Sequence, residues 1–402
     1  MQNKMTNLPQ GWEVKKLEEI ANIKGGKRLP KGKNLLDNNT KFAYIRVADF
    51  QDNGTINLQN IKFINENTYN VLKNYKIYDD NLYISIAGTI GKSGIIPKEL
   101  NGAILTENAV KLEYIQNNIS NKFMYFFTLS NIFKTQIQTS TKIVAQPKLV
   151  ITRLKQIQIP LPPLKEQERI VGILDESFAK IDESIKILEQ DLLNLDELMQ
   201  SALQKAFNPL KDNAKENYKL PQSWEWKSLE EISENISAGG DKPKNCTESK
   251  TAKNQIPVYA NGVNNNGLVG YTDKATIIKP SLTISARGTI GFVCIRKEPY
   301  FPIVRLISLI PCENILCLHY LYFCLNFFIA KGEGSSIPQL TIPKFKSLQI
   351  PLPPLKEQEQ IAEHLDFVFE KAKALKELYT KELKDYEELK QSLLNKAFKG
   401  EL

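Results

Sequence analysis

The chain contains two copies of one long module. The opening Leu8-Pro-Gln-Gly-Trp-Glu13 returns as Leu220-Pro-Gln-Ser-Trp-Glu225, and residues 159–168, Ile-Pro-Leu-Pro-Pro-Leu-Lys-Glu-Gln-Glu, return unchanged at 350–359. The spacing between the copies falls from 212 residues (8 to 220) to 191 residues (159 to 350), so loop lengths differ between the matching ends. Such a unit is too long for a solenoid repeat and occurs too few times for an array. The sequence therefore predicts a duplicated module and a pseudo-twofold molecule.

A long helix is predicted after each proline cluster. In the first copy, apolar residues follow the prolines in alternating steps of four and three over more than four heptads, as in a coiled coil. This seam consists of Leu174, Phe178, Ile181, Ile185, Leu188, Leu192, Leu195 and Met199, followed by Ala202 and Ala206. We expect the helix to run from Leu164 to Phe207 and to be stopped by Pro209.

The second helix is expected to begin after Pro353-Pro354 and to run to about Phe398, with Gly400 just past its end. Its seven-residue row consists of Leu365, Ala372, Tyr379, Tyr386 and Leu393. A coiled-coil seam also needs a second seven-residue row of apolar residues, as the first helix has, and here Lys376 and Lys390 interrupt that row. We expect the two helices to pair with each other in antiparallel fashion. The alternative is that each helix packs on its own globular part.

The sequence before each proline cluster predicts a mixed globular part. Short strands are expected at Ala43–Val47, Leu82–Ile86, Pro257–Tyr259 and Leu282–Ser285, with Gly- and Asn-rich turns around them. An aromatic helix is expected late in each part, at 123–127 and 320–323. We therefore assign the fold to the α+β class. The expected domains are a globular part at 1–160, a helix at 161–211, a globular part at 212–350 and a helix at 351–402.

Positive charge is concentrated in the globular parts. Counting Lys and Arg against Asp and Glu gives net charges of +10 for 1–160, −4 for 161–211, +4 for 212–350 and −2 for 351–402, within a total of +8. Two basic parts beside weakly acidic helices are typical of a protein that contacts a polyanion at two places. An ordinary lysine-rich surface is the alternative.

The sequence lacks a complete catalytic motif. Gly88-Thr-Ile-Gly-Lys-Ser93 resembles the end of a phosphate-binding loop, but that motif requires glycine where Ile86 stands. We interpret it as a strand–turn–strand element. Histidine chemistry is poorly supplied, since His319 and His364 are the only histidines. We therefore expect a chain that is not an enzyme.

Five sparse cysteines argue against a disulfide framework. A zinc site from Cys312, Cys317, His319 and Cys324 is the alternative, but the spacing contains no CxxC pair, and we predict no metal site. The N-terminus lacks an apolar segment typical of a secretion signal, and no window is apolar enough to span a membrane. We expect a cytoplasmic location.

The doubled Pro-Leu-Pro-Pro-Leu-Lys-Glu-Gln-Glu with a long helix after it, the Leu-Pro-x-x-Trp-Glu openings and the repeated Gly-Thr-Ile-Gly turns resemble the specificity subunit of a Type I restriction–modification system. The resemblance covers essentially the whole chain. It implies that each globular part is a target recognition domain for one half of a bipartite DNA sequence. The helices would be a spacer that also binds two modification subunits.

The resemblance also implies the partners' chemistry. Modification subunits would use S-adenosylmethionine to methylate adenine, and restriction subunits would use ATP and Mg²⁺ to translocate and cleave DNA. The chain itself would hold no cofactor.

Arginine, asparagine and glutamine are the residues that read base edges most readily, and lysines bind phosphates. Candidate base readers are Arg28, Arg46, Gln51, Lys92, Asn261, Asn264, Asn265 and Arg287. Candidate phosphate contacts are Lys27, Lys31, Lys33, Lys142, Lys331 and Lys344. We rank Arg46 and Arg287 first because they are expected at a strand end and a tight turn.

Two other functions stay open at this point. One is the recognition subunit of a methylation-only or a combined cutting–methylating system, which depends on neighbouring subunits. The other is a coiled-coil scaffold without base readout, which would show no sequence preference in DNA binding.

Overall fold

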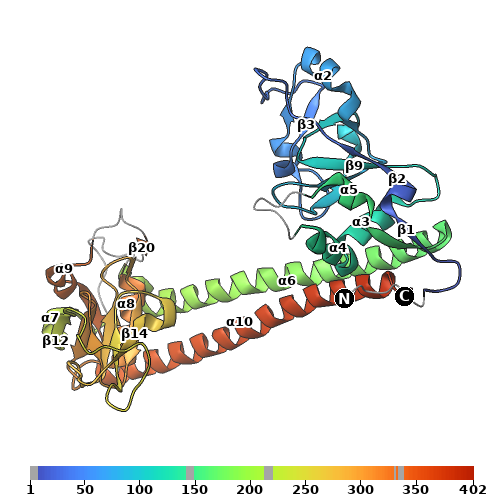
Figure 1. Cartoon of the computed structure of the whole chain (residues 1–402). Helices are drawn as coiled ribbons and strands as arrows, with labels where there is room; N and C mark the ends of the chain where they lie inside the picture. The colour runs from blue at the N-terminus through green and yellow to red at the C-terminus, as the bar shows by residue number, and fades with distance from the viewer. Residues whose placement is uncertain (1–7, 142–148, 212–220, 330–331, 334–338) are drawn as a thin grey trace. The chain divides into compact units, whose positions relative to one another are not determined.

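The computed structural model describes residues 8–141, 149–211, 221–329, 332–333 and 339–402. The chain divides into two compact units, and each unit combines segments from both copies. The first unit is Met1–Leu188 with Lys381–Leu402, and the second is Glu189–Thr380. The long helices α6 (Leu164–Lys211) and α10 (Leu355–Ala397) therefore contribute to both units (Figure 1).

The globular part of the first unit is built on sheets with mostly antiparallel neighbours. One sheet has the order β2 (Ala21–Gly25), β9 (Ala109–Tyr114), β6 (Leu82–Ser85) and β7 (Ser93–Ile95). Another has the order β4 (Lys62–Phe63), β3 (Ala43–Ile45), β8 (Ala103–Leu105) and β5 (Lys76–Ile77), with β3 and β8 parallel. The accompanying helices are α1 (Leu17–Ile20), α2 (Glu66–Leu72), α3 (Asn121–Leu129), α4 (Asn131–Thr141) and α5 (Ile151–Lys155).

The globular part of the second unit repeats this plan. One sheet has the order β12 (Ser233–Ala238), β19 (Ile307–Pro311), β15 (Ser281–Ile284) and β17 (Val293–Arg296). Another has the order β14 (Leu268–Thr272), β13 (Ile256–Tyr259) and β18 (Phe301–Pro302), with β13 and β18 parallel. A short pair joins β16 (Thr289–Ile290) to β20 (Gly332–Glu333), and the helices are α7 (Leu229–Ile232), α8 (Leu318–Phe328) and α9 (Ile342–Lys346). The α+β class, the four predicted strands and the two aromatic helices are confirmed.

An antiparallel ribbon closes each globular part immediately before its long helix. In the first unit β1 (Glu13–Lys16) pairs with β10 (Gln158–Leu161), and in the second β11 (Glu225–Ser228) pairs with β21 (Gln349–Leu352). The registers of the two ribbons correspond, because the opening motif of each copy lies opposite its own proline cluster. The two most similar segments of the sequence thus form one structural element in each copy.

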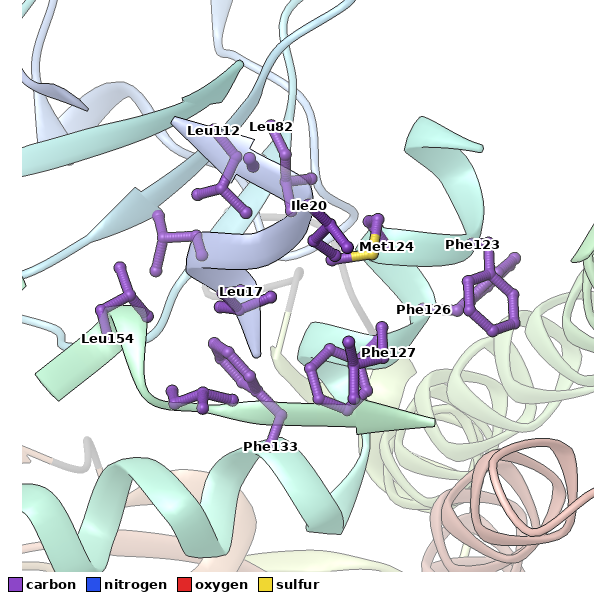
Figure 2. Packing of buried hydrophobic residues seen from close by; sticks show 14 of the residues in the cluster. Leu17, Ile20, Leu82, Leu112, Phe123, Met124, Phe126, Phe127, Phe133 and Leu154 are labelled. Atoms are coloured by element: carbon purple, nitrogen blue, oxygen red, sulfur yellow. The ribbon is translucent and has the colours of Figure 1, made fainter. Parts of the chain in front are cut away.

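Each core surrounds the aromatic helix. Figure 2 shows Met124 of α3 beside Ile20 of α1, whereas Phe123 and Phe126 lie on the side of α3 that faces the long helices. Ser120 caps this helix, since its side chain accepts a hydrogen bond from the Phe123 N–H (3.3 Å). Burying one such apolar side chain stabilises the fold by roughly 1.5–3 kcal/mol. The aromatic runs are therefore the centre of two separate cores.

The long helices pair in antiparallel fashion inside each unit, as predicted. All the named seam positions are buried or half-buried. The lysines that interrupt the second row form ion pairs across the helices, Lys390 with Asp182 (2.5 Å) in the first unit and Lys376 with Asp196 in the second. The two aspartates are as far apart along α6 as the two lysines are along α10. The same antiparallel register therefore holds in both units.

The predicted stop at Pro209 is wrong. Helix α6 continues to Lys211. A proline removes one backbone hydrogen bond and crowds the preceding turn, which costs less near the end of a helix than in its interior, where more turns would follow.

Candidate nucleic-acid interface

A buried glutamine fixes each globular part to the first turn of its long helix. Gln167, in α6, donates to the Pro162 and Asn118 carbonyl oxygens (2.9 and 3.1 Å) and accepts from the Ser120 N–H (2.9 Å). Both this side chain and its counterpart in α10 are at most 1% exposed. Three hydrogen bonds satisfy the buried amide, which would otherwise be costly to bury.

The counterpart in α10 makes the same three contacts. Gln358 donates to Pro353 and Ile315 carbonyl oxygens (2.8 and 2.9 Å) and accepts from the Cys317 N–H (2.9 Å). Because Ser120 and Cys317 are the residues where the aromatic helices begin, the glutamines orient α3 and α8 on the long helices.

Each long helix ends in the core of the other copy's globular part. Phe207, near the end of α6, packs against Tyr320 and Phe327 around α8, with ring centroids 5.8 and 5.4 Å apart. Phe398, just after α10, packs against Phe123 and Phe127 of α3 at 5.1 and 5.5 Å. Each globular part is therefore attached to the start of its own helix and to the end of the other.

Arg46, one of the two first-ranked candidates, lies in a local salt bridge. Its guanidinium donates to both carboxylate oxygens of Asp49 (2.5 and 3.0 Å) and to the Asn60 carbonyl oxygen (3.0 Å). The hydrogen bond with Asp49 raises the pKa of Arg46 above its usual value. The side chain is 29% exposed, so it could reach DNA only by loosening these contacts. Its base-reading role stays a prediction.

The other candidate base readers of the first unit differ in how far their side chains are exposed. Arg28 is 79% exposed and donates to Glu107 (2.6 Å), whereas Lys92 pairs with Asp52 (2.8 Å) and is 23% exposed. Gln51 is half-buried. Burial alone would raise the pKa of Glu107, but its hydrogen bonds, that of Arg28 foremost, outweigh burial and lower it. This carboxylate is therefore ionised at neutral pH and holds Arg28 in place.

The candidate phosphate contacts that can be located are exposed lysines. Lys27, Lys31 and Lys33 follow β2 in one loop, and Lys344 lies in α9. Lys142 and Lys331 lie outside the described residues. The loop after β2 brings three cations close together in sequence, which suits contact with a phosphate backbone.

The candidates of the second unit surround one loop cluster. Asn261 donates to the Val304 carbonyl oxygen (2.7 Å) and accepts from the Ala286 N–H (2.8 Å), so both ends of its amide are hydrogen-bonded. Asn264 and Asn265 are exposed. Arg287 is exposed and donates to Gln339 (3.0 Å). The structure thus brings Asn261 close to Arg287, because Asn261 accepts a hydrogen bond from Ala286, the residue directly before Arg287.

Sequence reasoning missed two arginines in this cluster. Arg296 is 8% exposed, with its guanidinium 3.6 Å from the Tyr259 ring centroid, and it donates to the Asn266 carbonyl oxygen (2.5 Å). Arg305 is exposed and occupies a left-handed backbone conformation. Glycine and asparagine are the residues that most often adopt this conformation, and neither occurs at 304–305. The conformation therefore could not be predicted from the local sequence.

Two of the residues considered as zinc ligands, His319 and Cys324, make other contacts. His319 Nδ1 lies 2.6 Å from Asp366 Oδ2, and Cys324 is fully buried in the core around α8. Within the described part of the chain, no group of three or more metal-ligating side chains is gathered. Within the same part, no helix has the length and apolar character that a bilayer span needs.

Comparison with known proteins identifies the family. The family model described as the Type I restriction modification DNA specificity domain matches residues 9–192 and 221–384. A Mycoplasma pneumoniae protein named as a type I specificity subunit is 29% identical over 357 residues, covering 87% of each chain. A Methanocaldococcus jannaschii protein named as the specificity subunit of restriction enzyme MjaX is 24% identical over 420 residues, covering 98% of this chain and 94% of that one.

Solved structures share the fold. A chain from a study of type I restriction–modification complex assembly superposes with a TM-score of 0.80 at 20% identity, covering 98% of this chain and all of that one. The HsdS subunit of Thermoanaerobacter tengcongensis gives a TM-score of 0.61 at 21% identity, with full coverage of both chains.

The chain therefore belongs to the family of Type I restriction–modification DNA specificity subunits. It recognises DNA in a sequence-specific manner, and it is a recognition subunit without a catalytic role of its own.

Proposed function

We propose that the chain reads a bipartite DNA target, one half with each globular part. The observation that carries this proposal is the repeated attachment of the two parts, in which Gln167 and Gln358 make equivalent hydrogen bonds at the start of each long helix. Equivalent attachments beneath differing loops suit two readers with different sequence preferences. The basic charge of both parts supplies affinity for phosphates.

The long helices provide a surface for partner subunits. Large apolar side chains remain 39–60% exposed along them, namely Ile187, Leu193, Leu198, Phe367, Leu375, Leu378 and Leu389. Apolar surface of this kind marks protein contacts. In our proposal two modification subunits bind there, use S-adenosylmethionine and methylate adenine. Restriction subunits with ATP and Mg²⁺ complete the complex, and this chain needs no cofactor.

The location proposed for this complex is the cytoplasm, where it would meet DNA. All five cysteines are free thiols, which supports a reducing compartment.

Methylome sequencing of cells with and without the chain tests the proposal. We expect one bipartite methylated adenine motif to be lost with the chain and restored when it is supplied again. Loss of an unbroken motif would contradict reading in two halves. If no methylated motif is lost, the proposed bipartite reading by this chain is refuted.

Affinity purification from the same cells tests the partners. We expect a methyltransferase subunit to copurify, and specific DNA binding to require it. Tight, specific binding by the isolated chain would contradict that requirement.

A further inference from the structure

The loop that joins β18 to β19 in the second unit contains a strained corner. Val304 and Arg305 have backbone φ angles of 53° and 60°. This left-handed conformation is unfavourable for residues other than glycine, and most of all for a β-branched residue such as valine. Strained conformations of this kind persist only where the surroundings enforce them, and they concentrate at functional sites.

Hydrogen bonds from two other segments enforce the corner. The N–H groups of Val304 and Arg305 donate to the carbonyl oxygens of Gly240 and Gly239, both at 2.8 Å. Gly239 must be glycine here, since a Cβ would lie 2.6 Å from the Ile303 nitrogen. The carbonyl oxygen of Val304 accepts from Asn261 (2.7 Å). The corner is thus held rigidly on the protein surface.

The side chains of the corner are available to a ligand. Val304 is 50% exposed, and Arg305 is exposed. Of the residues that the structure describes, none forms an ion pair or a side-chain hydrogen bond with Arg305. Asn261 also binds the N–H of Ala286, directly before Arg287. One asparagine therefore holds the backbone next to two exposed arginines.

The first unit has different chemistry at the equivalent corner. The parallel pairs Ile45 with Leu105 and Tyr259 with Pro302 align the two loops, so that Asn108 occupies the place of Arg305. The neighbouring Glu107, which takes the place of Val304, is hydrogen-bonded to Arg28. The two copies are alike where they attach to the helices and differ at this corner, which suits a specificity determinant.

We propose that the corner Val304–Arg305 is a base-reading element, in which Arg305 binds the O6 and N7 atoms of a guanine in the major groove. This inference rests on the proposed bipartite reading and assigns one base contact within it. A rigid backbone favours paired hydrogen bonds from arginine to guanine, the commonest specific contact in the major groove. Exposed Val304 beside it can contact a thymine methyl group. Asn261 acts as a positioning residue.

Selection of bound sequences from a random DNA library tests the assignment. The full-length chain is used with its copurifying partners. We expect Arg305→Ala to lower discrimination at a single guanine of one half-site roughly 5- to 150-fold and to leave the other half-site unchanged. Arg305→Lys should fail in the same way, because lysine keeps the charge without the planar fork. Asn261→Ala should lower discrimination at the same guanine, because the corner loses a hydrogen bond that holds it in place.

Lys297→Ala is the matched control, since it removes one exposed positive charge from the same globular part. It should weaken binding to all sequences slightly, if at all. A uniform loss of affinity in Arg305→Ala, rescued by Arg305→Lys, would make this a phosphate contact and overturn the proposal. An unchanged motif in Arg305→Ala would overturn it as well. A wild-type complex that selects no bipartite motif would refute the proposed function instead, and melting temperatures equal to wild type exclude misfolding.

Discussion

The two units use the same attachments and different surfaces. Their closing ribbons, buried glutamines and terminal phenylalanines correspond one to one. Even the side-chain contact between the first turn of the aromatic helix and the long helix occupies the same place in both units, with different residue types. Lys122 pairs with Asp175 in the first unit (2.7 Å), where His319 pairs with Asp366 in the second (2.6 Å). The loops, in contrast, share few side chains. The attachment geometry is thus the same in both units, while the loops that we propose to contact DNA differ.

Lengthening both helices should have the largest effect. Inserting the same three heptads after Leu188 and after Thr380 leaves each unit whole and keeps the antiparallel register. The addition is about 31 Å of helix, close to one turn of DNA. We expect methylation of the native target to fall more than 100-fold, and the preferred gap between half-sites to grow by about 9–10 base pairs.

Methylation of targets whose gap is varied one base pair at a time measures this shift. In the wild type we expect a gap of roughly 5–8 base pairs, because two domains on one face of DNA lie about one turn apart. The half-site sequences should stay the same. Activity that ignores the gap length would show that the helices do not set the distance.

Removing a terminal phenylalanine should destabilise the unit that receives it. Phe398→Ala should cost about 3–5 kcal/mol in the first unit, and Phe207→Ala a similar amount in the second, because both rings are fully buried. Hydrogen exchange resolved by peptide should show faster exchange in α3 for the former and in α8 for the latter. Leu389→Ala, which truncates a side chain that is 45% exposed, is the control. Faster exchange confined to the helix that carries the substitution would contradict this crossed attachment.

Removing a buried glutamine should have a smaller and local effect. Gln167→Ala leaves two carbonyl groups and one N–H without their partner, which should cost about 2–4 kcal/mol. We expect recognition to weaken in the first half-site for Gln167→Ala and in the second for Gln358→Ala. Denaturant unfolding and library selection measure the two effects. Equal weakening of both half-sites by one substitution would contradict the claim that each glutamine orients only its own globular part.

The smallest expected effect concerns the pH dependence of stability, to which Glu107 contributes at the corner of the first unit. The lowered pKa of Glu107 means that its stabilising contribution is present at neutral pH and is lost as the pH falls through its folded-state pKa. Glu107→Gln should therefore reduce stability by up to about 1 kcal/mol at pH 7 and by nothing at strongly acidic pH. Urea unfolding from pH 7 to pH 3 measures the difference. Glu248→Gln, which removes an exposed carboxylate from another loop of the second unit, is the control, and an equal pH dependence there would contradict the assignment.

Much of the scaffold could be predicted because repetition and heptad spacing are visible in a single sequence. The seam from Leu174 to Met199 and the paired helices followed from periodicity, and the aromatic helices from composition. Lys376 and Lys390 read as interruptions because their partners, Asp196 and Asp182, lie on the other helix. Contacts between distant segments leave no local pattern.

The reading surface was harder to predict. Arg46 was ranked by its place at a strand end, although Asp49 three residues later already offered a local partner. Arg305 went unnoticed because its exposure and backbone conformation depend on Gly239, Gly240 and Asn261, which are far away in sequence. Loops whose shape is imposed by remote hydrogen bonds cannot be recognised from their own residues.

The crossed position of Phe398 has a consequence for synthesis on the ribosome. The first globular part leaves the ribosome long before Phe398, the residue that completes its core, because more than 250 residues separate α3 from Phe398 in the sequence. At about 5–20 residues per second, the aromatic site on α3 waits on the order of 10 to 50 seconds for its last ring. During that interval the nascent chain exposes the surface that chaperones and proteases bind. Only a chain translated as far as Phe398 covers this site, so a product that terminates earlier leaves the aromatic face of α3 exposed.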